Sequence, residues 1–167
     1  MLYIHTQPFI AMIKKILVGI DDSKYAENAA EYGFKLAESL NAQLGLVHIV
    51  ENMVMPNSGS ADTILGVPMM GLNNPNELEI IDAQTEISEN LLERTAKKFA
   101  GKLQVTHFNE YGPTVDGIIN CATEFKADLI ILGTHHRSGF DRLLMGNVAE
   151  DVLRHSKIPV LVVPFVE

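Results

Sequence analysis

The stretch LIILGTHHRSGFDRLLMGNVAEDVLRHSKIPVLVV, residues 129–163, contains the pattern that indicates the fold of this chain. It begins and ends with short aliphatic runs, which are typical of strands buried on both faces of a parallel sheet. Between the runs lie three glycines and then an amphipathic period from about Asn147 to His155. The stretch therefore predicts a strand, a glycine-bearing loop, a helix and a second strand.

The residues before this stretch repeat the alternation of strand and helix. Aliphatic runs occupy residues 13–20 and 42–50, and residues 103–108 alternate as in a strand exposed on one side. Helical apolar periods occupy residues 24–40, 80–99 and 115–125. Ser23 is a residue type that caps helix starts, Asn41 closes the same helix, and the second period should bury Ile87 and Leu91. We expect a doubly wound, Rossmann-like α/β fold, which is a five-stranded, mainly parallel sheet with helices on both faces.

The length of 167 residues fits one domain. We expect a single domain over residues 13–167, preceded by a disordered extension over residues 1–12. Met12 opens MIKKILVGIDDS, which has the form of a natural beginning, so residues 1–11 are interpreted as an extension or the product of an upstream start. A long loop is expected at about residues 51–76, and both a lid and a loosely packed excursion fit its length.

The composition restricts the partners. The chain has 13 Lys and Arg residues and 21 Asp and Glu residues, which gives a formal net charge of −8. Because nucleic-acid binding needs clustered basic residues, we expect no nucleic-acid partner. No run approaches the roughly 20 apolar residues of a membrane span. Residues 1–11 lack the pattern of a secretory signal, so we expect no membrane partner and a cytoplasmic location.

The single cysteine, Cys121, lies on the apolar side of a predicted helix and is interpreted as a core residue.

The loops at the carboxyl ends of the strands are the expected ligand site, because doubly wound sheets bind ligands where the winding direction reverses. Gly133 is predicted to end a buried strand, and Gly146–Asn147 to open the next helix. The backbone N–H groups and the dipole of such a helix start favour a phosphate. The alternative is that Asn147 only caps the helix and Glu150 completes a capping box, and the spacing fits both interpretations.

The motifs of several enzyme classes are missing from the sequence. It contains no G-x-G-x-x-G fingerprint, no G-x4-G-K-S/T phosphate loop and no G-x-S-x-G nucleophile elbow. His135 and His136 are adjacent and would point to different sides of a regular backbone, which is poor geometry for a shared metal ion. We therefore expect no catalytic residues and no metal site of the protein's own.

The residues that carry a family resemblance lie at both ends of the chain. KKILVGIDDS, VHIVE and ADLIILGTHHRSGFDRLLMGNVAEDVLRHSKIPVLVVP are similar to the universal stress protein family, and the resemblance extends over residues 13–164. It implies a parallel sheet in the strand order 3-2-1-4-5, a homodimer formed largely through the C-terminal strand, and in many members a site for ATP or AMP.

The nucleotide-binding branch of that family has the motif G-x2-G-x9-G-S/T. Gly133 matches its first glycine and Gly146 its third, whereas His136 replaces the second glycine and Asn147 the final hydroxyl residue. Histidine at a position that needs positive φ costs about 1 to 2 kcal/mol. Replacing the hydroxyl by an amide should weaken binding by about 1 kcal/mol, or five- to tenfold.

The resemblance also assigns roles to single residues. It implies that Asp21 lies near the adenosine or a phosphate-bound metal, that Ile49 offers its backbone to adenine, and that Arg137 or Arg142 reaches phosphate. The alternatives are a turn residue for Asp21 and solvated side chains for the arginines. The expected nucleotide-binding set is Ile20, Asp21, Ile49, Leu132, Gly133, His136, Arg137, Gly139, Gly146, Asn147 and Val148.

Two functions are consistent with these residues. The first is a cytoplasmic stress-response homodimer that binds ATP or AMP, with or without Mg²⁺, and acts through nucleotide occupancy rather than turnover. The second is a nucleotide-independent dimeric interaction module of the same family. Gly133, Gly139 and Gly146 favour the first function, and His136 and Asn147 favour the second.

Overall fold

The computed structural model describes residues 13–51, 63–64, 67–68, 75–135 and 147–165, and the structural statements that follow concern these residues. The expected extension over residues 1–12 lies outside them. Most of the expected loop at 51–76 does so too, apart from a short antiparallel pair, β3 (Thr63–Ile64) and β4 (Val67–Pro68).

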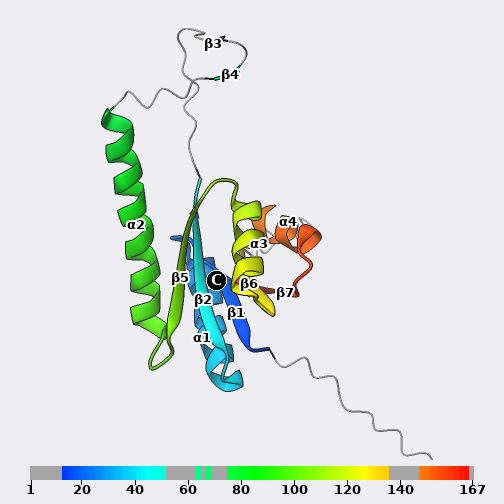
Figure 1. The fold of residues 1–167 in the computed structure, drawn as a ribbon. Coiled ribbons are helices and arrows are strands. Elements are labelled where there is room, and N and C mark those ends of the chain that lie inside the picture. Colours follow the sequence, from blue (N-terminus) through cyan, green and yellow to red (C-terminus); the bar gives the residue numbers. More distant parts are fainter. Residues whose placement is uncertain (1–12, 52–62, 65–66, 69–74, 136–146, 166–167) are drawn as a thin grey trace, which may run out of the picture.

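The centre of the structure is a parallel sheet of five strands (Figure 1). The strands are β1 (Lys15–Gly19), β2 (Gln43–Val50), β5 (Val105–Tyr111), β6 (Leu129–His135) and β7 (Val160–Phe165). Their spatial order is β5-β2-β1-β6-β7, which is 3-2-1-4-5 when the five are numbered along the chain. The predicted fold class and strand order are confirmed.

Four helices cover the two faces of this sheet. They are α1 (Lys24–Leu40), α2 (Pro75–Phe99), α3 (Thr114–Phe125) and α4 (Asn147–His155). Helices α1 and α2 pack on one face, and α3 and α4 pack on the other (Figure 1). The ends of α1 form as the sequence predicts, because the Ser23 hydroxyl accepts a hydrogen bond from the Ala26 N–H and Asn41 takes the left-handed conformation at the C-cap.

Alternate residues of each strand fill two cores. Ile16 and Val18 of β1 belong to the core under α1 and α2, whereas Leu17 belongs to the core under α3 and α4. Cys121 lies in the second core with 2% of its surface exposed, as the sequence predicts, and burial raises the pKa of its thiol to about 11. The thiol is therefore protonated at neutral pH.

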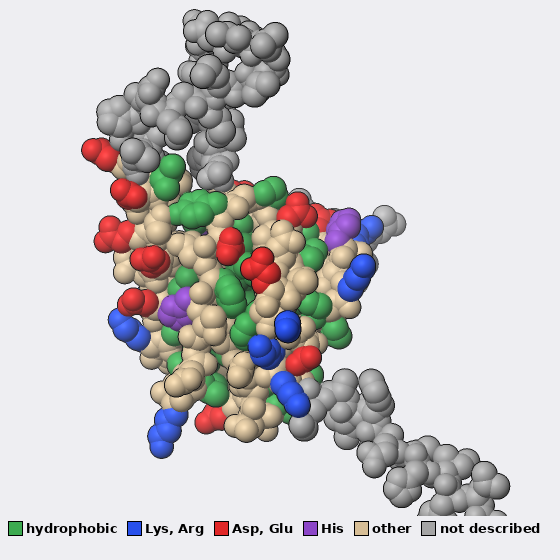
Figure 2. Space-filling model, in the orientation of Figure 1, with side chains coloured by type: hydrophobic (Ala, Val, Ile, Leu, Met, Phe, Trp, Pro, Cys, Tyr) green, Lys and Arg blue, Asp and Glu red, His purple; other side chains and the backbone are tan. Residues whose placement is uncertain are grey.

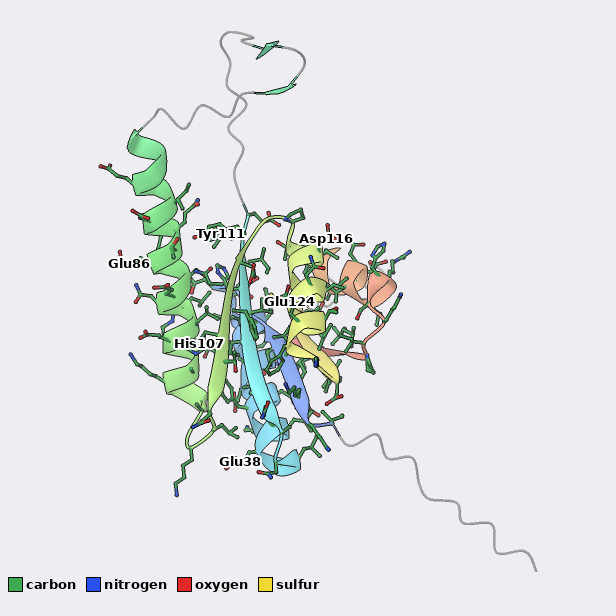
Figure 3. All side chains as sticks on the ribbon, viewed as in Figure 1. Glu38, Glu86, His107, Tyr111, Asp116 and Glu124 are labelled. Carbon is green, nitrogen blue, oxygen red and sulfur yellow. The ribbon has the colours of Figure 1, made fainter. Side chains whose placement is uncertain are left out.

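Helix α2 differs from the sequence prediction in the face that it buries. Ile87 was expected in the core, but it is 67% exposed, and the next residue, Ser88, is 0% exposed. The helix turns the set Ser88, Leu91, Leu92 and Thr95 toward the sheet. Glu86, beside Ile87, points away from the sheet (Figure 3). A serine is tolerated inside because its hydroxyl is hydrogen-bonded, as described below.

One side of α2 is acidic. Acidic side chains gather over this helix in Figure 2, and the exposed ones include Glu79, Asp82, Glu86 and Glu89. Two ion pairs, Arg94 with Asp22 and Lys98 with Glu27, join the carboxyl-terminal half of α2 to the start of α1.

Within the described residues, no helix combines the length and hydropathy needed to cross a bilayer.

Gly133 lies where β6 meets the first turn of α1. The sequence predicted that the strand ends at Gly133, and this prediction is wrong. The strand continues to His135 because Thr134 and His135 pair with Pro164 and Phe165 of β7. A Cβ added to Gly133 would lie 2.2 Å from the Tyr25 carbonyl oxygen and 3.0 Å from the Ala26 nitrogen. Close packing of backbone on backbone therefore requires glycine at this position.

We predict that Gly133→Ala lowers the free energy of unfolding by about 1–3 kcal/mol, because the backbone of α1 cannot move aside without disturbing the core. Gly19→Ala is the matched control, since its added Cβ would meet side-chain ends alone, the Leu132 Cδ2 at 2.5 Å and the Ile118 Cδ1 at 3.7 Å. Urea unfolding of both variants measures the difference. Equal losses in the two variants would contradict the assignment.

Candidate functional site

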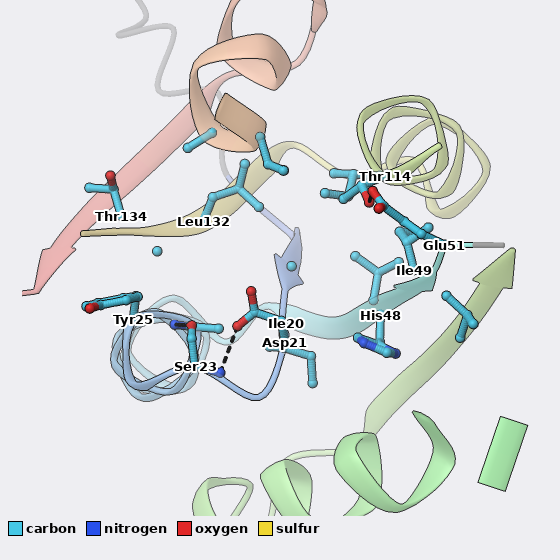
Figure 4. Close-up of a pocket in the computed structure, with 18 of the residues that line it drawn as sticks. Ile20, Asp21, Ser23, Tyr25, His48, Ile49, Glu51, Thr114, Leu132 and Thr134 are labelled. Carbon is cyan, nitrogen blue, oxygen red and sulfur yellow. Dashed lines mark hydrogen bonds between the residues drawn. The ribbon is translucent and has the colours of Figure 1, made fainter. Parts of the chain in front are cut away.

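A pocket of about 770 Å³ opens at the carboxyl ends of β1, β2 and β6. Its walls also include the starts of α1, α3 and α4 and one turn of α2, through residues such as Tyr25, Thr114, Val148 and Ile87. Figure 4 shows Tyr25 and Thr134 at one end and Thr114 and Glu51 at the other. The pocket lies where the order of the strands reverses, which is the position that the sequence predicts for a ligand site.

Six of the residues predicted to bind nucleotide line this pocket. They are Ile20, Asp21, Ile49, Leu132, Gly133 and Val148. Their contact with a nucleotide stays a prediction. His136, Arg137, Gly139, Arg142 and Gly146 lie outside the described residues. Asn147 is the first residue of α4, and its side chain is likewise outside the description.

The start of α4 borders the pocket. Val148, which is 38% exposed, and Ala149 are lining residues in the first turn of this helix. The first backbone N–H groups of a helix have no partner inside the helix, and together with the helix dipole they attract negative charge. This border of the pocket is therefore a favourable position for an anionic group.

Asp21 is a turn residue, and it also lines the pocket. It follows β1, and its Oδ1 accepts a hydrogen bond of 2.9 Å from the Ser23 N–H, which forms the turn into α1. The same residue lines the pocket, as Figure 4 shows. The hydrogen bond of this turn therefore holds the Asp21 carboxylate at the pocket wall, and its contact with a nucleotide stays a prediction.

The charged side chains that line the described part of the pocket are both acidic, Asp21 and Glu51. Glu51 accepts a hydrogen bond from the Thr114 hydroxyl, which links the end of β2 to the start of α3. Carboxylates repel phosphate and accept hydrogen bonds from hydroxyl or amino groups. The pocket is therefore suited to a ligand with donors near Asp21 and Glu51 and an anionic group near α4.

A hydrogen-bonded chain beside the pocket was missed in the sequence. The Nδ1 of His48, on β2, lies 2.7 Å from the Ser88 Oγ of α2, and the Ser88 hydroxyl donates to Asn109 Oδ1 of β5 at 2.7 Å. His48 also lines the pocket. The signals that could have found it are a histidine inside the aliphatic run at 42–50 and a serine three residues before Leu91 on the buried face of α2.

Burial lowers the pKa of His48 below its usual 6.5, and the Asp21 carboxylate opposes part of that shift. The ring is therefore neutral at pH 7. A neutral imidazole carries one N–H donor and one acceptor nitrogen. The hydrogen bond at Nδ1 therefore decides whether Nε2 is a donor or an acceptor toward other groups.

A parallel sheet in this order, with helices on both faces and a pocket at its reversal point, defines a doubly wound, Rossmann-like α/β protein. The model of the universal stress protein family matches residues 12–164. The chain therefore belongs to the universal stress protein family.

Known proteins agree with this membership. The chain is 31% identical over 157 residues to universal stress protein MJ0577 of Methanocaldococcus jannaschii, covering 91% of this chain and 95% of the relative. A solved universal stress protein family structure from Burkholderia pseudomallei superposes with a TM-score of 0.66 at 25% identity, covering 93% and 98% of the two chains. A solved universal stress protein in complex with cAMP shares the fold with a TM-score of 0.58 at 23% identity, covering 92% and 98%.

We predict that His48 makes the protein less stable in mild acid. Its folded pKa is lowered, so the unfolded chain binds the proton more readily once the pH falls below about 6.5. The contribution of His48 to stability is complete above that pH and is lost as the pH falls through the folded pKa. The difference in unfolding free energy between the wild type and His48→Asn, measured from pH 8 to pH 5, should shrink on acidification; a constant difference would contradict the prediction.

Proposed function

We propose that this chain is a binding protein for an adenine nucleotide, ATP or AMP, and that its output is ligand occupancy in a cytoplasmic homodimer rather than turnover. The observation that carries the proposal is the pocket, which joins an apolar wall at the end of β2 to the start of α4. Its 770 Å³ lies within the range of small-molecule sites, roughly 300–1,000 Å³.

The two ends of the pocket fit the two ends of a nucleotide. Ile49, Ile87 and Ile118 supply an apolar surface for a flat base. Asp21 can accept a hydrogen bond from a hydroxyl or amino group, and the N–H groups at the start of α4 can hold phosphate. This orientation keeps the phosphates away from Glu51.

The cAMP ligand belongs to the solved relative, and at 23% identity that likeness shows the fold alone. The ligand of that relative decides only which ligand class is tested first, namely adenine nucleotides. Binding by this chain rests on the pocket residues described above.

Magnesium would enter with the nucleotide. Within the described residues, no group of three or more His, Cys, Asp or Glu side chains is arranged to hold a metal ion. Mg²⁺ bound to the phosphates would reduce their repulsion from Asp21, so the effect of Mg²⁺ should be larger for ATP than for AMP.

A nucleotide-independent interaction module is the second candidate. It is favoured by Gly133, since packing against Tyr25 and Ala26 explains this glycine without any ligand. It is also favoured by Asp21, which the turn into α1 accounts for.

We predict that Val148→Glu weakens ATP binding by about tenfold, because a carboxylate in the first turn of α4 would repel the phosphates. Acidic residues are well tolerated at helix starts, so the fold should be retained. Val148→Gln has similar size without the charge and should bind almost as the wild type does. Calorimetry with ATP and AMP, with and without Mg²⁺, measures these affinities; no binding by the wild type at millimolar nucleotide would favour the interaction module.

We predict a homodimer joined through β7. This strand lies at the edge of the sheet, pairs with β6 only among the described strands, and leaves Val160, Leu161 and Val162 partly exposed. Apolar edge strands are normally covered or paired in soluble proteins. Sedimentation velocity over a wide range of protein concentration should show the mass of a dimer, and a stable monomer would contradict the prediction.

A further inference from the structure

The two ring nitrogens of His48 have different surroundings. Nδ1 lies 2.7 Å from the Oγ of Ser88, a residue with no exposed surface, and no described residue forms a hydrogen bond with Nε2. The ring itself is partly buried and lines the pocket below Ile49 in Figure 4. Three elements, β2, α2 and β5, hold the ring in place through Ser88 and Asn109.

The hydrogen bonds determine the tautomer of this ring. A serine hydroxyl has one proton, and that of Ser88 is donated to Asn109 Oδ1. The Oγ of Ser88 can then only accept, so the Nδ1 of His48 is the donor. A neutral imidazole has no second N–H, and Nε2 is therefore left with its lone pair as an acceptor.

The charges around the ring preserve this arrangement at neutral pH. Ser88 and Gln84 on α2 and Asn109 on β5 are uncharged, and among the described residues Asp21 is the charged group that acts on His48. Burial outweighs the attraction of Asp21 and disfavours the imidazolium form. His48 and Asp21 thus both present acceptors, so a ligand bound between them needs donors.

We propose that His48 is a specificity-determining residue of the pocket, whose Nε2 accepts a hydrogen bond from an N–H or O–H group of the bound nucleotide. This inference rests on the proposed nucleotide function and assigns to the same site a residue outside the predicted set. An adenine nucleotide offers such a donor in two places, the exocyclic amine of the base and the hydroxyls of the ribose.

Two substitutions separate the two nitrogens. In His48→Asn the amide nitrogen takes the place of Nδ1 and can still donate to Ser88, but nothing replaces Nε2. In His48→Gln the amide reaches the place of Nε2, and its oxygen can accept from the ligand. Binding of each protein to AMP, 2′-deoxy-AMP, 3′-deoxy-AMP and purine riboside monophosphate, which lacks the amine, is measured by calorimetry.

The wild type should bind AMP about five- to tenfold more tightly than the analogue that lacks the donor. His48→Asn should bind AMP and that analogue equally, and His48→Gln should recover part of the preference. The analogue that binds more weakly than AMP to the wild type identifies the donor as the amine or as one of the ribose hydroxyls. If the wild type binds AMP but the substitutions leave every preference unchanged, the inference is overturned and the proposed function stands.

A second measurement needs no nucleotide. In the ligand-free protein, the ¹⁵N NMR shifts of His48 should show a protonated Nδ1 and an unprotonated Nε2, and Ser88→Ala should abolish this preference. A protonated Nε2 in the neutral ring overturns the inference directly. If the tautomer is as expected but the wild type binds neither AMP nor ATP, the proposed function fails and the role of His48 in nucleotide selection fails with it.

Discussion

The contact between β6 and the first turn of α1 is the constraint on which the pocket depends. Gly133 has no side chain, so the backbone of Tyr25 and Ala26 can lie directly against the strand. All three residues line the pocket, and α1 continues from there across β1, β6 and β7. A side chain at Gly133 would push the helix away and change the shape of the wall that faces the α4 start. The same glycine thus serves the fold and the site, and its presence alone does not distinguish a nucleotide-binding chain from one that only keeps the scaffold.

Much of the fold could be predicted from the sequence because its signals are local. Ser23 and Asn41 bound α1 as their residue types indicate, and α4 spans the predicted residues. The continuous aliphatic runs predicted strands buried on both faces, since helices on each side of a parallel sheet leave few polar positions. The order of the strands came from the family resemblance rather than from periodicity, because the period of a strand contains no information about its neighbours.

The errors concern features that depend on contacts distant in sequence. Hydrophobicity placed Ile87 in the core, whereas the structure buries Ser88 because Asn109 and His48, on two separate strands, satisfy its hydroxyl. The end of β6 was misplaced at Gly133 because pairing with β7 extends the strand. Three of the predicted residues that line the pocket were accessible to local reasoning, since Ile20 and Asp21 follow β1 and Val148 begins α4. The other three, Ile49, Leu132 and Gly133, lie inside strands and were assigned to the site by the family resemblance. His48 also lies inside a strand, where the sequence indicates only burial, and it was missed because the resemblance assigned it no role.

The chain of hydrogen bonds from His48 through Ser88 to Asn109 has a direction, because every member donates to the next. A half-turn of the Asn109 carboxamide would present its NH₂ group to Ser88, and the hydroxyl would then donate to the imidazole. The ring would respond by moving its own proton to the other nitrogen. The polarity of this part of the pocket wall therefore depends on the orientation of one carboxamide, that of Asn109 on the edge strand β5.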